Sequence, residues 1–433
     1  MNEFANNFFE KLMQDFDSRL NHSGIDGKRL ANRLALLSEI GVTSENGSNR
    51  MGFSKEERQA KELVKSWMQE AGLVVREDGA GNVFGRLKGK DSTAPAILSG
   101  SHVDSVPNGG HFDGPLGVLV ALEVAEAWNE TGFQPRKSYE VVVFTDEEGA
   151  RFSGGFSGSA AMIGDVNEED QLKLRDLNGD SFKTVIEADG LSVAEYFSAK
   201  RNVKEEIAAF IEVHIEQGKQ LEKKNLPVGV VTGIAGPCWL ELSFHGEAGH
   251  AGNTPMNDRK DALIAASMFI HELERFPKEV SPTAVATVGR VQVYPNGINV
   301  IPGKVTLTVD VRDIFKETRD LLVEEIIKMA QEVAEHRGVR IEVIENLRIA
   351  PVLIPVQMQG KMMKAVEEHG VEAHLLPSGA GHDSMIVGRH VPTAMLFVRS
   401  KDGISHNPKE WSSLNDCVMA AHVLKSVIED LAE

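Results

Sequence analysis

Short apolar runs typical of strands alternate with helical patterns from residue 55 to about residue 235. A helix is expected near 55–71. The segments APAILSGSHVDSV, SYEVVVFTDEEG and IAAFIEVHIEQG have strand character, and GVLVALEVAEAW forms a helix between the first two. Strands separated by helices predict a largely parallel sheet covered by helices on both faces. In such a sheet, chemistry is expected at the carboxyl ends of the strands.

A different pattern begins after VGVVTGIAGP, near residue 234. Strands and long helices then follow in the order β-α-β-β-α-β, through CWLELSFHG, RKDALIAASMFIHELERF, AVATVGRVQVY, KVTLTVDVRD, KETRDLLVEEIIKMAQEVAEH and VRIEVIEN. This is the order of the split βαβ, ferredoxin-like sandwich, which folds independently. We therefore expect an inserted domain at residues 234–349.

The last segment, residues 350–433, returns to a helix, a strand (TAMLFVRS) and a final helix, and we expect it to complete the domain formed by residues 1–233. The predicted fold is therefore α/β with two domains. One holds a mostly parallel, mixed sheet sandwiched by helices, and the other is the inserted βαββαβ unit. Residues 167–205 are acidic and rich in lysine, and we expect a solvated helical excursion there.

Length and composition agree with this organisation. A chain of 433 residues is too long for one ordinary hydrophobic core. Hydrophobic residues make up 42% and charged residues 25%, as in soluble globular proteins. The 46 Lys and Arg residues against 64 Asp and Glu residues give a net charge of −18, which argues against nucleic acid or an anionic membrane surface as the main partner.

The first residues, MNEFANNFFEKLMQDFDSRL, carry acids throughout and have an amphipathic pattern, so we interpret them as a helix and not as a secretory signal or membrane span. The two cysteines, Cys238 and Cys417, are far apart in the sequence and form no metal-type pair. This usage suggests a reducing compartment without structural disulfides, and we expect a cytoplasmic protein.

One short segment raises a question of charge. FTDEEGARFSG, at residues 144–154, passes directly from an apolar strand into Asp146, Glu147 and Glu148. Clustered carboxylates repel one another, and the repulsion costs free energy unless a positive charge lies among them. Either these acids face water or a cation is held there.

Five candidate ligands for such a cation lie at or after the ends of predicted strands. His102 ends PAILSGSH, Asp113 lies in NGGHFDGPLG, Glu148 follows the next strand, His214 lies in IEVHIEQG and His406 in GISHNP. Each alone is more simply explained as a polar loop residue. Five such coincidences at equivalent positions are improbable, so together they predict a metal site.

Three imidazoles and two carboxylates suit Zn²⁺, Mn²⁺, Co²⁺ or Ni²⁺ and not Ca²⁺, which prefers oxygen ligands. If one carboxylate bridges, the five ligands give each of two ions three contacts and leave positions open for water and substrate.

Glu147 and Glu148 are adjacent, and adjacent side chains of an extended chain point in opposite directions, so one is expected to be a ligand and the other free. A free carboxylate beside an activated water is placed to accept its proton and return it to a leaving nitrogen. Asp104 lies two residues beyond His102, where it could accept the second imidazole N–H and orient the ring.

These segments resemble a known family. GSHVDSVPNGGHFDGPLGV, FTDEEGARFSG, HIEQG, AGHAGNTPM, NVIPGKVTLTVDVRD, GAGHDS and ISHNP occur in order over nearly the whole chain. Together they look like the dinuclear-metal aminoacylase and carboxypeptidase superfamily, of peptidase family M20 type. Within it they resemble the branch of N-carbamoyl-L-amino acid hydrolase, β-ureidopropionase and allantoate amidohydrolase.

The resemblance implies a role for each matching residue. Asp113 would bridge two ions, with His102 and His214 on one and Glu148 and His406 on the other. Glu147 would be the general base and acid. His250 in AGHAGNTPM would stabilise the oxyanion, whereas His245 is expected to be structural. The remaining substrate contacts would come from Asn299 and Arg312 on the carboxylate, and from Gln217, Gly381 and His382.

Arg312 also has a case of its own. In KVTLTVDVRD, the apolar residues from Val305 to Val311 alternate with a polar set that ends at Arg312, which therefore projects from the face away from the core. Its guanidinium suits a carboxylate. The alternative is a simple salt bridge to Asp310 or Asp313. Two other residues in site loops remain open: His111 is expected to be a loop residue, and Asp146 replaces the asparagine that is common in the family.

The resemblance implies hydrolysis of the ureido C–N bond of N-carbamoyl-L-amino acids to amino acid, ammonia and carbon dioxide. The first alternative is allantoate amidohydrolase, and the next is a metallo-dipeptidase or aminoacylase, against which His214 weighs because peptidase branches tend to use a carboxylate there. A non-enzymatic relative would be expected to have lost ligands, yet all five and Glu147 are present. The inserted domain implies a lid and a homodimer.

Overall fold

The computed structural model describes residues 1–433 and divides the chain into two compact units. Unit 1 comprises Met1–Thr232, Ile354–Leu376 and His382–Glu433, and unit 2 comprises Gly233–Leu353 and Pro377–Gly381. Unit 2 is thus one long insertion together with a short segment that precedes His382. The sequence pattern alone assigned that short segment to the larger domain.

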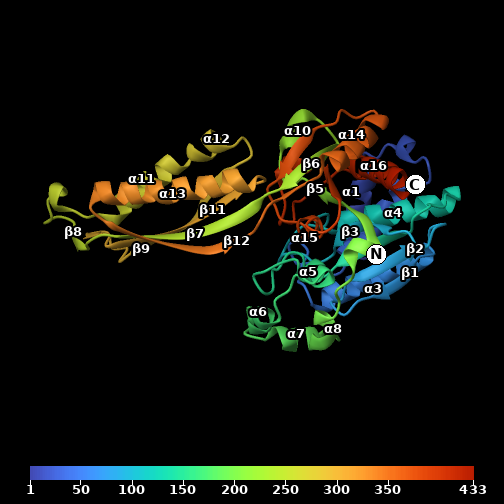
Figure 1. Ribbon diagram of the computed structural model, residues 1–433, viewed down its shortest axis with the longest axis horizontal. Coiled ribbons are helices and arrows are strands. Elements are labelled where there is room, and N and C mark those ends of the chain that lie inside the picture. Colours follow the sequence, from blue (N-terminus) through green and yellow to red (C-terminus); the bar gives the residue numbers. More distant parts are fainter. The chain divides into compact units, whose positions relative to one another are not determined.

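Unit 1 is built on a mixed sheet (Figure 1). Four neighbouring strands at its centre, β4, β3, β5 and β15, are parallel to one another, whereas β1, β2 and β6 pair in antiparallel fashion. In spatial order the strands are β1 (Val74–Glu77), β2 (Val83–Leu87), β4 (Tyr139–Phe144), β3 (Ala96–His102), β5 (Ile207–Ile215), β15 (Thr393–Val398), β6 (Val228–Ile234) and β13 (Val352–Leu353), and β14 (Leu375–Ser378) also pairs with β6.

The parallel arrangement is therefore confined to the centre of the sheet. The turn between β1 and β2 spans five residues, 78–82, which is too short for the crossover that parallel strands need. It is held by Asp78, whose carboxylate accepts hydrogen bonds from the backbone N–H groups of Ala80 and Asn82. Tight turns of this kind make the antiparallel flank, which the apolar pattern of the strands did not reveal.

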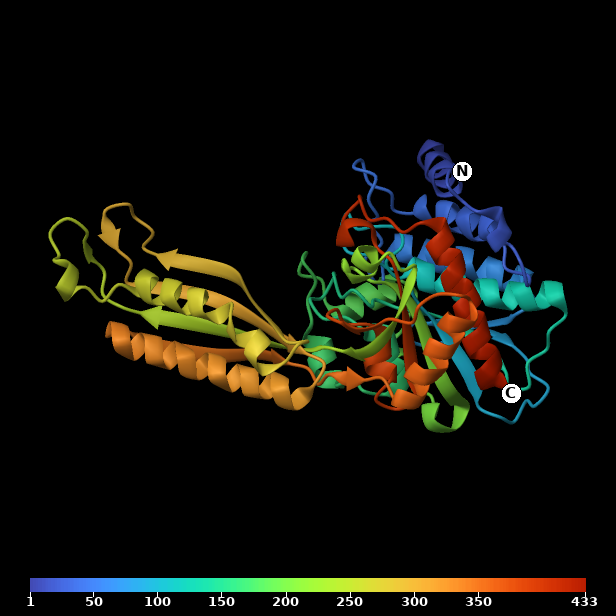
Figure 2. The same cartoon turned by 90° about the horizontal axis from the view of Figure 1, so that it is seen from above.

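Helices cover both faces of this sheet, and the C-terminal helix α16, red in Figure 2, packs against α4 and the central strands. On the opposite face, α5 and α15 share an apolar cluster that includes Leu98, Val142 and Phe210. The helices of unit 1 are α1 (Glu3–Met13), α2 (Gly27–Ser38), α3 (Lys55–Glu70), α4 (Pro115–Thr131), α5 (Ser157–Ile163), α6 (Glu168–Lys173), α7 (Phe182–Ala188), α8 (Val193–Phe197), α9 (Val203–Glu206), α10 (Gln220–Lys224), α14 (Val356–Glu368), α15 (Asp383–Val387) and α16 (Leu414–Ala432).

The sequence explains why α4 starts and stops where it does. Pro115 occupies the first turn, where no backbone N–H is needed, and Gly132 follows the last residue in the left-handed conformation with φ 70°. Nearly all of α4 is buried between the sheet and the outer helices. Because α4 begins two residues after Asp113, this packing fixes the position of that carboxylate at the end of the sheet.

Residues 167–205 form the expected helical excursion, but it is only partly solvated. The acidic helix α6 has no buried residue. By contrast, α7 and α8 bury Phe182 and Tyr196 completely in a cluster that also contains Phe53 and Phe152. The sequence did not predict this cluster, because its apolar residues are few, are spread over several short helices and lie among many charged residues.

Unit 2 contains a four-stranded antiparallel sheet with the spatial order β12-β7-β11-β9. Along the chain, strand and helix alternate as β7, α11, β9, β11, α13 and β12, with shorter elements between them. The elements are β7 (Gly236–His245), β8 (Gly249–His250), α11 (Ala262–Leu273), α12 (Phe276–Val280), β9 (Val285–Tyr294), β10 (Val300–Ile301), β11 (Lys304–Asp313), α13 (Lys316–Arg337), β12 (Arg340–Arg348) and β13 (Val352–Leu353).

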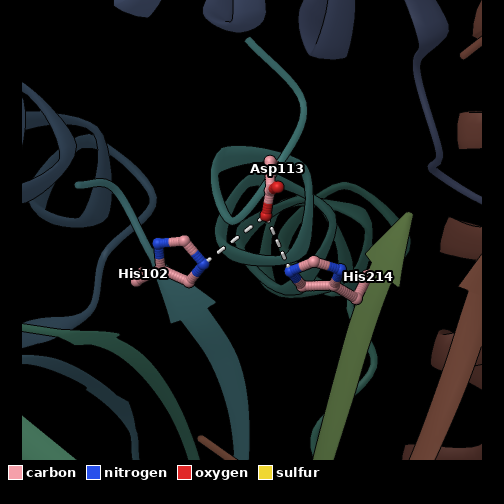
Figure 3. A group of neighbouring side chains, drawn as sticks. All are labelled: His102, Asp113 and His214. Carbon is pink, nitrogen blue, oxygen red and sulfur yellow. Dashed lines mark ion pairs between the residues drawn. The ribbon is translucent and has the colours of Figure 1, made fainter. Parts of the chain in front are cut away.

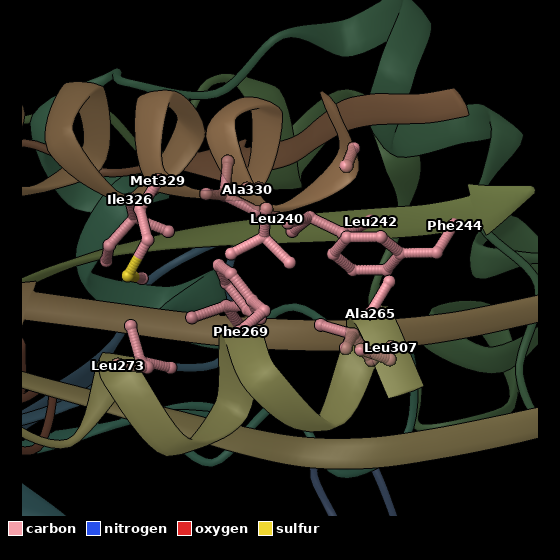
Figure 4. Close-up of a cluster of buried hydrophobic side chains, with 14 of the residues drawn as sticks. Leu240, Leu242, Phe244, Ala265, Phe269, Leu273, Leu307, Ile326, Met329 and Ala330 are labelled. Carbon is pink, nitrogen blue, oxygen red and sulfur yellow. The ribbon is translucent and has the colours of Figure 1, made fainter. Parts of the chain in front are cut away.

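The core of unit 2 lies between one face of this sheet and the helices α11 and α13 (Figure 4). Alternate residues of β7, such as Leu240 and Leu242, point into it and meet Phe269 from α11 and Ile326 from α13. The residues of β11 from Val305 to Val311 alternate as the sequence predicts, and its apolar positions are buried. The opposite face of the sheet has no helix on it.

No helix in the structure combines the length and the apolar character needed to cross a lipid bilayer. The N-terminal segment forms the amphipathic helix α1, as expected. The side chain of Asn2 caps its first turn, and Ala5, Phe8 and Leu12 form its buried face. Both cysteines are buried and free, which agrees with the absence of a predicted disulfide between them.

Candidate metal centre

The carboxyl ends of the four parallel strands bring the candidate ligands together. His102 is the last residue of β3, and His214 is the last but one of β5. Glu148 follows β4, and His406 lies in the loop after β15. With Asp113, which precedes α4, these residues form two groups whose ligand atoms lie within 4.8 Å of one another.

The first group consists of His102, Asp113 and His214, all buried (Figure 3). Nε2 of His214 lies 3.1 Å from Oδ1 of Asp113, and Nε2 of His102 lies 3.8 Å from the same oxygen. The two imidazoles come from neighbouring parallel strands, and the carboxylate lies between them. One carboxylate oxygen therefore faces two ring nitrogens.

The hydrogen bonds of Nδ1 show which nitrogen of His102 and of His214 faces the cluster. Nδ1 of His102 lies 3.1 Å from the carbonyl oxygen of Asp104, and Nδ1 of His214 lies 3.0 Å from that of Ile215. Because a carbonyl oxygen can only accept, Nδ1 carries a proton in each ring, and Nε2 is the nitrogen that a metal ion could bind. Nε2 of His102 is buried and has no hydrogen-bond partner. A buried ring nitrogen in this position fits a metal ligand.

The second group consists of Asp113, Glu148 and His406. Nε2 of His406 lies 3.3 Å from Oδ2 of Asp113 and 3.3 Å from Oε2 of Glu148. The two oxygens of Asp113 thus face different groups, Oδ1 toward the first and Oδ2 toward the second. This is the arrangement that a bridging carboxylate needs. The first group offers two imidazoles and one carboxylate, and the second offers one imidazole and two carboxylates. Both sets of ligands suit Zn²⁺ or Mn²⁺.

Glu147 belongs to neither group, and its carboxylate lies near the first. Oε2 of Glu147 is 3.7 Å from Nε2 of His102. The sequence argument assumed an extended chain here, and that assumption was wrong: β4 ends at Phe144, and Asp146 has the left-handed φ of 53°. The two glutamates nevertheless diverge, because this turn directs Glu147 toward His102 and Glu148 toward His406.

Asp104 holds that turn in place. Its two carboxylate oxygens accept hydrogen bonds from the backbone N–H groups of Glu147 and Glu148, each at 3.1 Å. Oδ1 of Asp104 also lies 3.3 Å from Nδ1 of His102, although the closer acceptor for that nitrogen is the carbonyl oxygen of Asp104. The sequence predicted an orienter for His102, and in the structure Asp104 contacts both the histidine and the acidic turn.

The electrostatics of the cluster show that it lacks positive charge. Burial raises the pKa of Glu147 well above its ordinary value, and burial together with the charge of Asp113 raises the pKa of Glu148 to about 8. Burial alone would lower the pKa of His102, but the charge of Glu147 and other nearby carboxylates outweighs it and raises that pKa. A divalent cation among these groups would favour ionised acids and neutral imidazoles.

Three residues of the site have backbone conformations that are unusual outside glycine. Asp146, Gln217 and His406 have φ values of 53°, 54° and 53°. Aspartate and asparagine tolerate the left-handed region better than most residues, so the aspartate at position 146 is a mild exchange. Histidine is also enriched there, whereas glutamine tolerates it less well, and such strain persists where the surroundings hold it and where function needs it.

Gln217 was expected to contact substrate, and it does lie at the cluster. In this structure, however, its side chain contacts a candidate ligand. Its Nε2 donates to Oδ2 of Asp113 at 2.8 Å and to Oγ of Ser405 at 3.1 Å. His382 is also at the site: its ring centroid lies 4.4 Å from that of His214, and burial lowers its pKa well below the ordinary value. His111, by contrast, lies in a loop but is buried, and its ring packs against Phe4 and Phe8.

Sequence reasoning missed three buried acids around the centre. Glu212 on β5 accepts hydrogen bonds from Oγ of Ser101 and the backbone N–H of Ser384. The carboxylate of Asp383 is buried beside it, and burial raises its pKa well above the ordinary value. Glu410 contacts the backbone of Asp113. An acid within the apolar run IAAFIEVHI was a usable signal for Glu212, whereas Asp383 and Glu410 lie in motifs without such contrast.

The predicted substrate residues of unit 2 lie at two ends of one strand. Arg312 is near the end of β11, where Asp310 accepts from its Nε and Nη2 and the carbonyl oxygen of Gly379 accepts from Nη1 at 2.7 Å. The salt bridge to Asp310 that the sequence left open is therefore present. Gly381 belongs to the same short segment as Gly379.

His250 and Asn299 lie together at the other end. The carbonyl oxygen of Asn299 accepts from the N–H of Ala251, and His250 pairs with Val300 next to the start of β11. From Lys304 to Arg312 the strand advances by eight residues, or about 26 Å at 3.3 Å per residue. One chain does not bring Asn299 and Arg312 together on one carboxylate. Nearby His245 lies 3.4 Å from Glu342, in agreement with a structural role.

Comparisons with known proteins agree with this geometry. Residues 98–430 match the model of peptidase family M20/M25/M40. The N-carbamoyl-L-amino acid amidohydrolase of Geobacillus stearothermophilus is 44% identical over 94% of this chain and 99% of its own length. The allantoate amidohydrolase of Bacillus subtilis is 37% identical over 92% of this chain and 95% of its own length.

Among solved structures, an amidase of the hydantoinase/carbamoylase family from Burkholderia multivorans superposes with a TM-score of 0.88. It is 34% identical and the match covers 94% of this chain and 98% of that chain. The resemblance seen in the sequence motifs is thereby confirmed over nearly the whole length. On the evidence of the matched motifs, the common fold and these relatives, the chain belongs to peptidase family M20/M25/M40.

Proposed function

We propose that this protein is a metal-dependent amidohydrolase that cleaves the ureido C–N bond of N-carbamoyl-L-amino acids, giving the amino acid, ammonia and carbon dioxide. The observation that carries the proposal is the position of Asp113, whose two oxygens face two separate ligand groups while the carboxylate of Glu147 remains free beside them. The names of the relatives supply the substrate class.

Two divalent ions, Zn²⁺ or one of Mn²⁺, Co²⁺ and Ni²⁺, would fit this centre; His102 and His214 would hold one, Glu148 and His406 the other, and Asp113 would serve both. Such ions would supply Lewis-acid activation of water and of the ureido oxygen. Their preference for nitrogen and oxygen ligands matches the donor set.

The chain's own groups move the proton. Glu147, buried and close to the centre, accepts the proton of the attacking water and then donates it to the departing nitrogen. Asp104 keeps the carboxylate in place by holding the backbone on both sides of the acidic pair. His250 would stabilise the negative charge that develops on the ureido oxygen.

Arg312 is proposed to hold the substrate's carboxylate. Asp310 and Gly379 occupy three of the five N–H groups of the guanidinium, which leaves one on each terminal nitrogen for a further acceptor. Asp310 would then fix the plane of the guanidinium, while the free N–H groups bind the substrate.

Replacing Arg312 with methionine is expected to lower kcat/KM for N-carbamoyl-L-methionine by about 10- to 100-fold, the effect of losing hydrogen bonds to a charged group. The amide of the same substrate, which has no carboxylate, should react equally slowly with wild type and variant. Arg275→Met is the matched control, because Arg275 is an exposed arginine of the same unit, paired with Glu272 on α11 and away from the uncovered sheet face. An Arg312 variant that still prefers the acid over the amide would contradict the assignment.

Allantoate is the second candidate substrate, because a relative of 37% identity is named for it. Turnover of N-carbamoyl-L-methionine and of allantoate by manganese-loaded protein decides between the two. The proposal expects a clear excess of kcat/KM for the carbamoyl amino acid, and a preference for allantoate would replace it with the second function.

We propose that unit 2 is a ferredoxin-like lid and dimerisation domain. Its element order and its strand order β12-β7-β11-β9 support the ferredoxin-like fold. Its uncovered sheet face supports a role in dimerisation, because large apolar side chains are exposed there, among them Trp239 at 43% and Ile344 at 47%. Apolar groups exposed together mark interaction surfaces, and a second copy of the chain is the proposed partner.

A dimer would also explain why the substrate residues of one unit 2 are separated. If His250 and Asn299 serve the site of the partner subunit, each complete site takes Arg312 from one copy and His250 from the other. The substrate then contacts all of them without bending β11.

Mixed dimers test this arrangement. We expect Glu147→Gln and His250→Ala each to be nearly inactive alone. If His250 acts on the partner's site, a dimer of the two variants contains one intact site, and random mixing restores about a quarter of the wild-type activity per chain. Activity that stays at the level of the separate variants, in mixtures shown to exchange subunits, would mean that His250 serves its own chain.

A further inference from the structure

We propose that Glu410 is a positioning residue that fixes the bridging carboxylate of Asp113, an inference that rests on the proposed dinuclear centre. Glu410 lies in the loop that carries His406, four residues beyond it, and is 4% exposed. No role in the reaction described above uses this side chain.

The two oxygens of Glu410 reach Asp113 by different routes. Oε1 accepts hydrogen bonds from the backbone N–H of Phe112 at 2.9 Å and from that of Asp113 at 3.0 Å. Oε2 lies 2.9 Å from Oγ of Ser405, and the same hydroxyl lies 2.8 Å from Oδ2 of Asp113. Glu410 therefore reaches the main chain of Asp113 directly and its side chain through Ser405.

The surrounding chain makes room for this carboxylate. A Cβ atom at Gly110 would lie 2.0 Å from Oε1 of Glu410, so a side chain at this position would displace the carboxylate from its place against the loop. The buried guanidinium of Arg50 contributes a compensating positive charge to both Glu410 and Asp104. Glu410 is thus built into the interior, and its contacts are not those of a surface side chain.

Asp104 provides a precedent within the same molecule. It accepts from the two consecutive N–H groups of Glu147 and Glu148, just as Glu410 accepts from those of Phe112 and Asp113. In each case a buried carboxylate from another segment holds the backbone of a candidate ligand. Together, Glu410 and Asp104 fix the backbone of the two acidic candidate ligands, Asp113 and Glu148.

Positioning matters here because Asp113 must face both groups at once. Metal ligands have to lie within a few tenths of an ångström of their ideal positions, and loss of a group that orients a ligand typically weakens metal affinity by about 10- to 100-fold. Asp113 touches five of the side chains described above, so a rotation of its backbone would disturb both groups together.

The test is calorimetric titration of chelator-treated protein with Mn²⁺, with Glu410→Ala and Glu410→Gln compared with wild type. We expect Glu410→Ala to bind Mn²⁺ about 10- to 100-fold more weakly. Glu410→Gln should bind within a few-fold of wild type, because its carbonyl oxygen accepts from both N–H groups and its amide donates to Ser405.

Asp78→Ala is the matched control. It removes another carboxylate that accepts from two backbone N–H groups, in the β1–β2 turn, and should leave Mn²⁺ affinity unchanged. If Glu410→Ala fails to fold, Ser405→Ala carries the test, because it removes the link to Oδ2 and should weaken Mn²⁺ binding to a smaller extent.

Two results would overturn the inference: wild-type Mn²⁺ affinity in folded Glu410→Ala, or a Glu410→Gln variant as weak as the alanine variant. The second result would mean that the charge of Glu410 matters and not its hydrogen bonds. If wild type itself binds no Mn²⁺, the proposed function fails and not this inference alone.

Discussion

Replacing Glu147 with glutamine is expected to lower kcat for N-carbamoyl-L-methionine roughly 1,000-fold, within the range that general acid–base catalysis contributes. Glutamine has the same shape but cannot accept and return a proton. The ligands of both groups remain, so metal content measured by mass spectrometry should stay at the wild-type value. KM should change little, because Glu147 is not assigned to substrate binding.

Glu148→Gln is the matched contrast, because it changes the adjacent residue in the same turn. Glu148 faces His406 and Asp113, so this variant should lose metal as well as activity, and added Mn²⁺ should restore part of the activity. If Glu147→Gln keeps kcat within a few-fold of wild type, or if it is Glu147→Gln that loses metal, the roles of the two acids have been assigned wrongly.

Asp113→Asn is expected to have the largest effect on metal content. Its two oxygens face both groups, so its loss should reduce binding at both positions, and hydrolysis should fall by at least about 1,000-fold. His406→Ala removes a ligand of the second group alone and should leave one ion bound. Metal analysis after gel filtration distinguishes the two variants.

If the Asp113→Asn protein retains one firmly bound ion, a bridging role is contradicted. Asp113 would then behave as a ligand of one group only, because its replacement would remove one ion and not both. Thermal unfolding of each variant serves as a control for folding. Asp113 also accepts from Gln217 and Ser405, and the amide of asparagine can still contact those side chains.

The sequence was sufficient to predict that the candidate ligands come together, because its signal is local. Each candidate ligand lies at or just beyond the end of a strand that an apolar run identifies, and parallel strands bring their carboxyl ends to the same edge. His102 and His214 are clear examples, since each lies at or next to the end of an almost completely buried strand. The identity of the central strands and the gathering of five side chains both followed from this rule.

Contacts between distant segments could not be predicted in the same way. Glu410 and Asp113 are nearly 300 residues apart, and nothing in NPKEW shows that its acid is buried against a backbone turn. The turn at Asp146 depends on a left-handed conformation, which Asp and Asn allow but do not require. Gln217 was expected to face substrate, and only the folded loop reveals its contact with Asp113.

The strand pattern of unit 2 also left a distance undetermined. KVTLTVDVRD identified the face on which Arg312 lies, but the position of Asn299 depends on the loop before the strand. The separation of the two residues along β11 became apparent only in the structure. It leads to the proposal that a second subunit completes the site.

The central claim is that divalent ions compensate the buried acids of this cluster and make hydrolysis possible. The most direct measurement is the metal content of purified, active protein, followed by turnover of N-carbamoyl-L-methionine before and after chelation. The account predicts two ions per chain, loss of hydrolysis when both are removed and its return with added Mn²⁺. Full activity in protein shown to contain no divalent ion would contradict it.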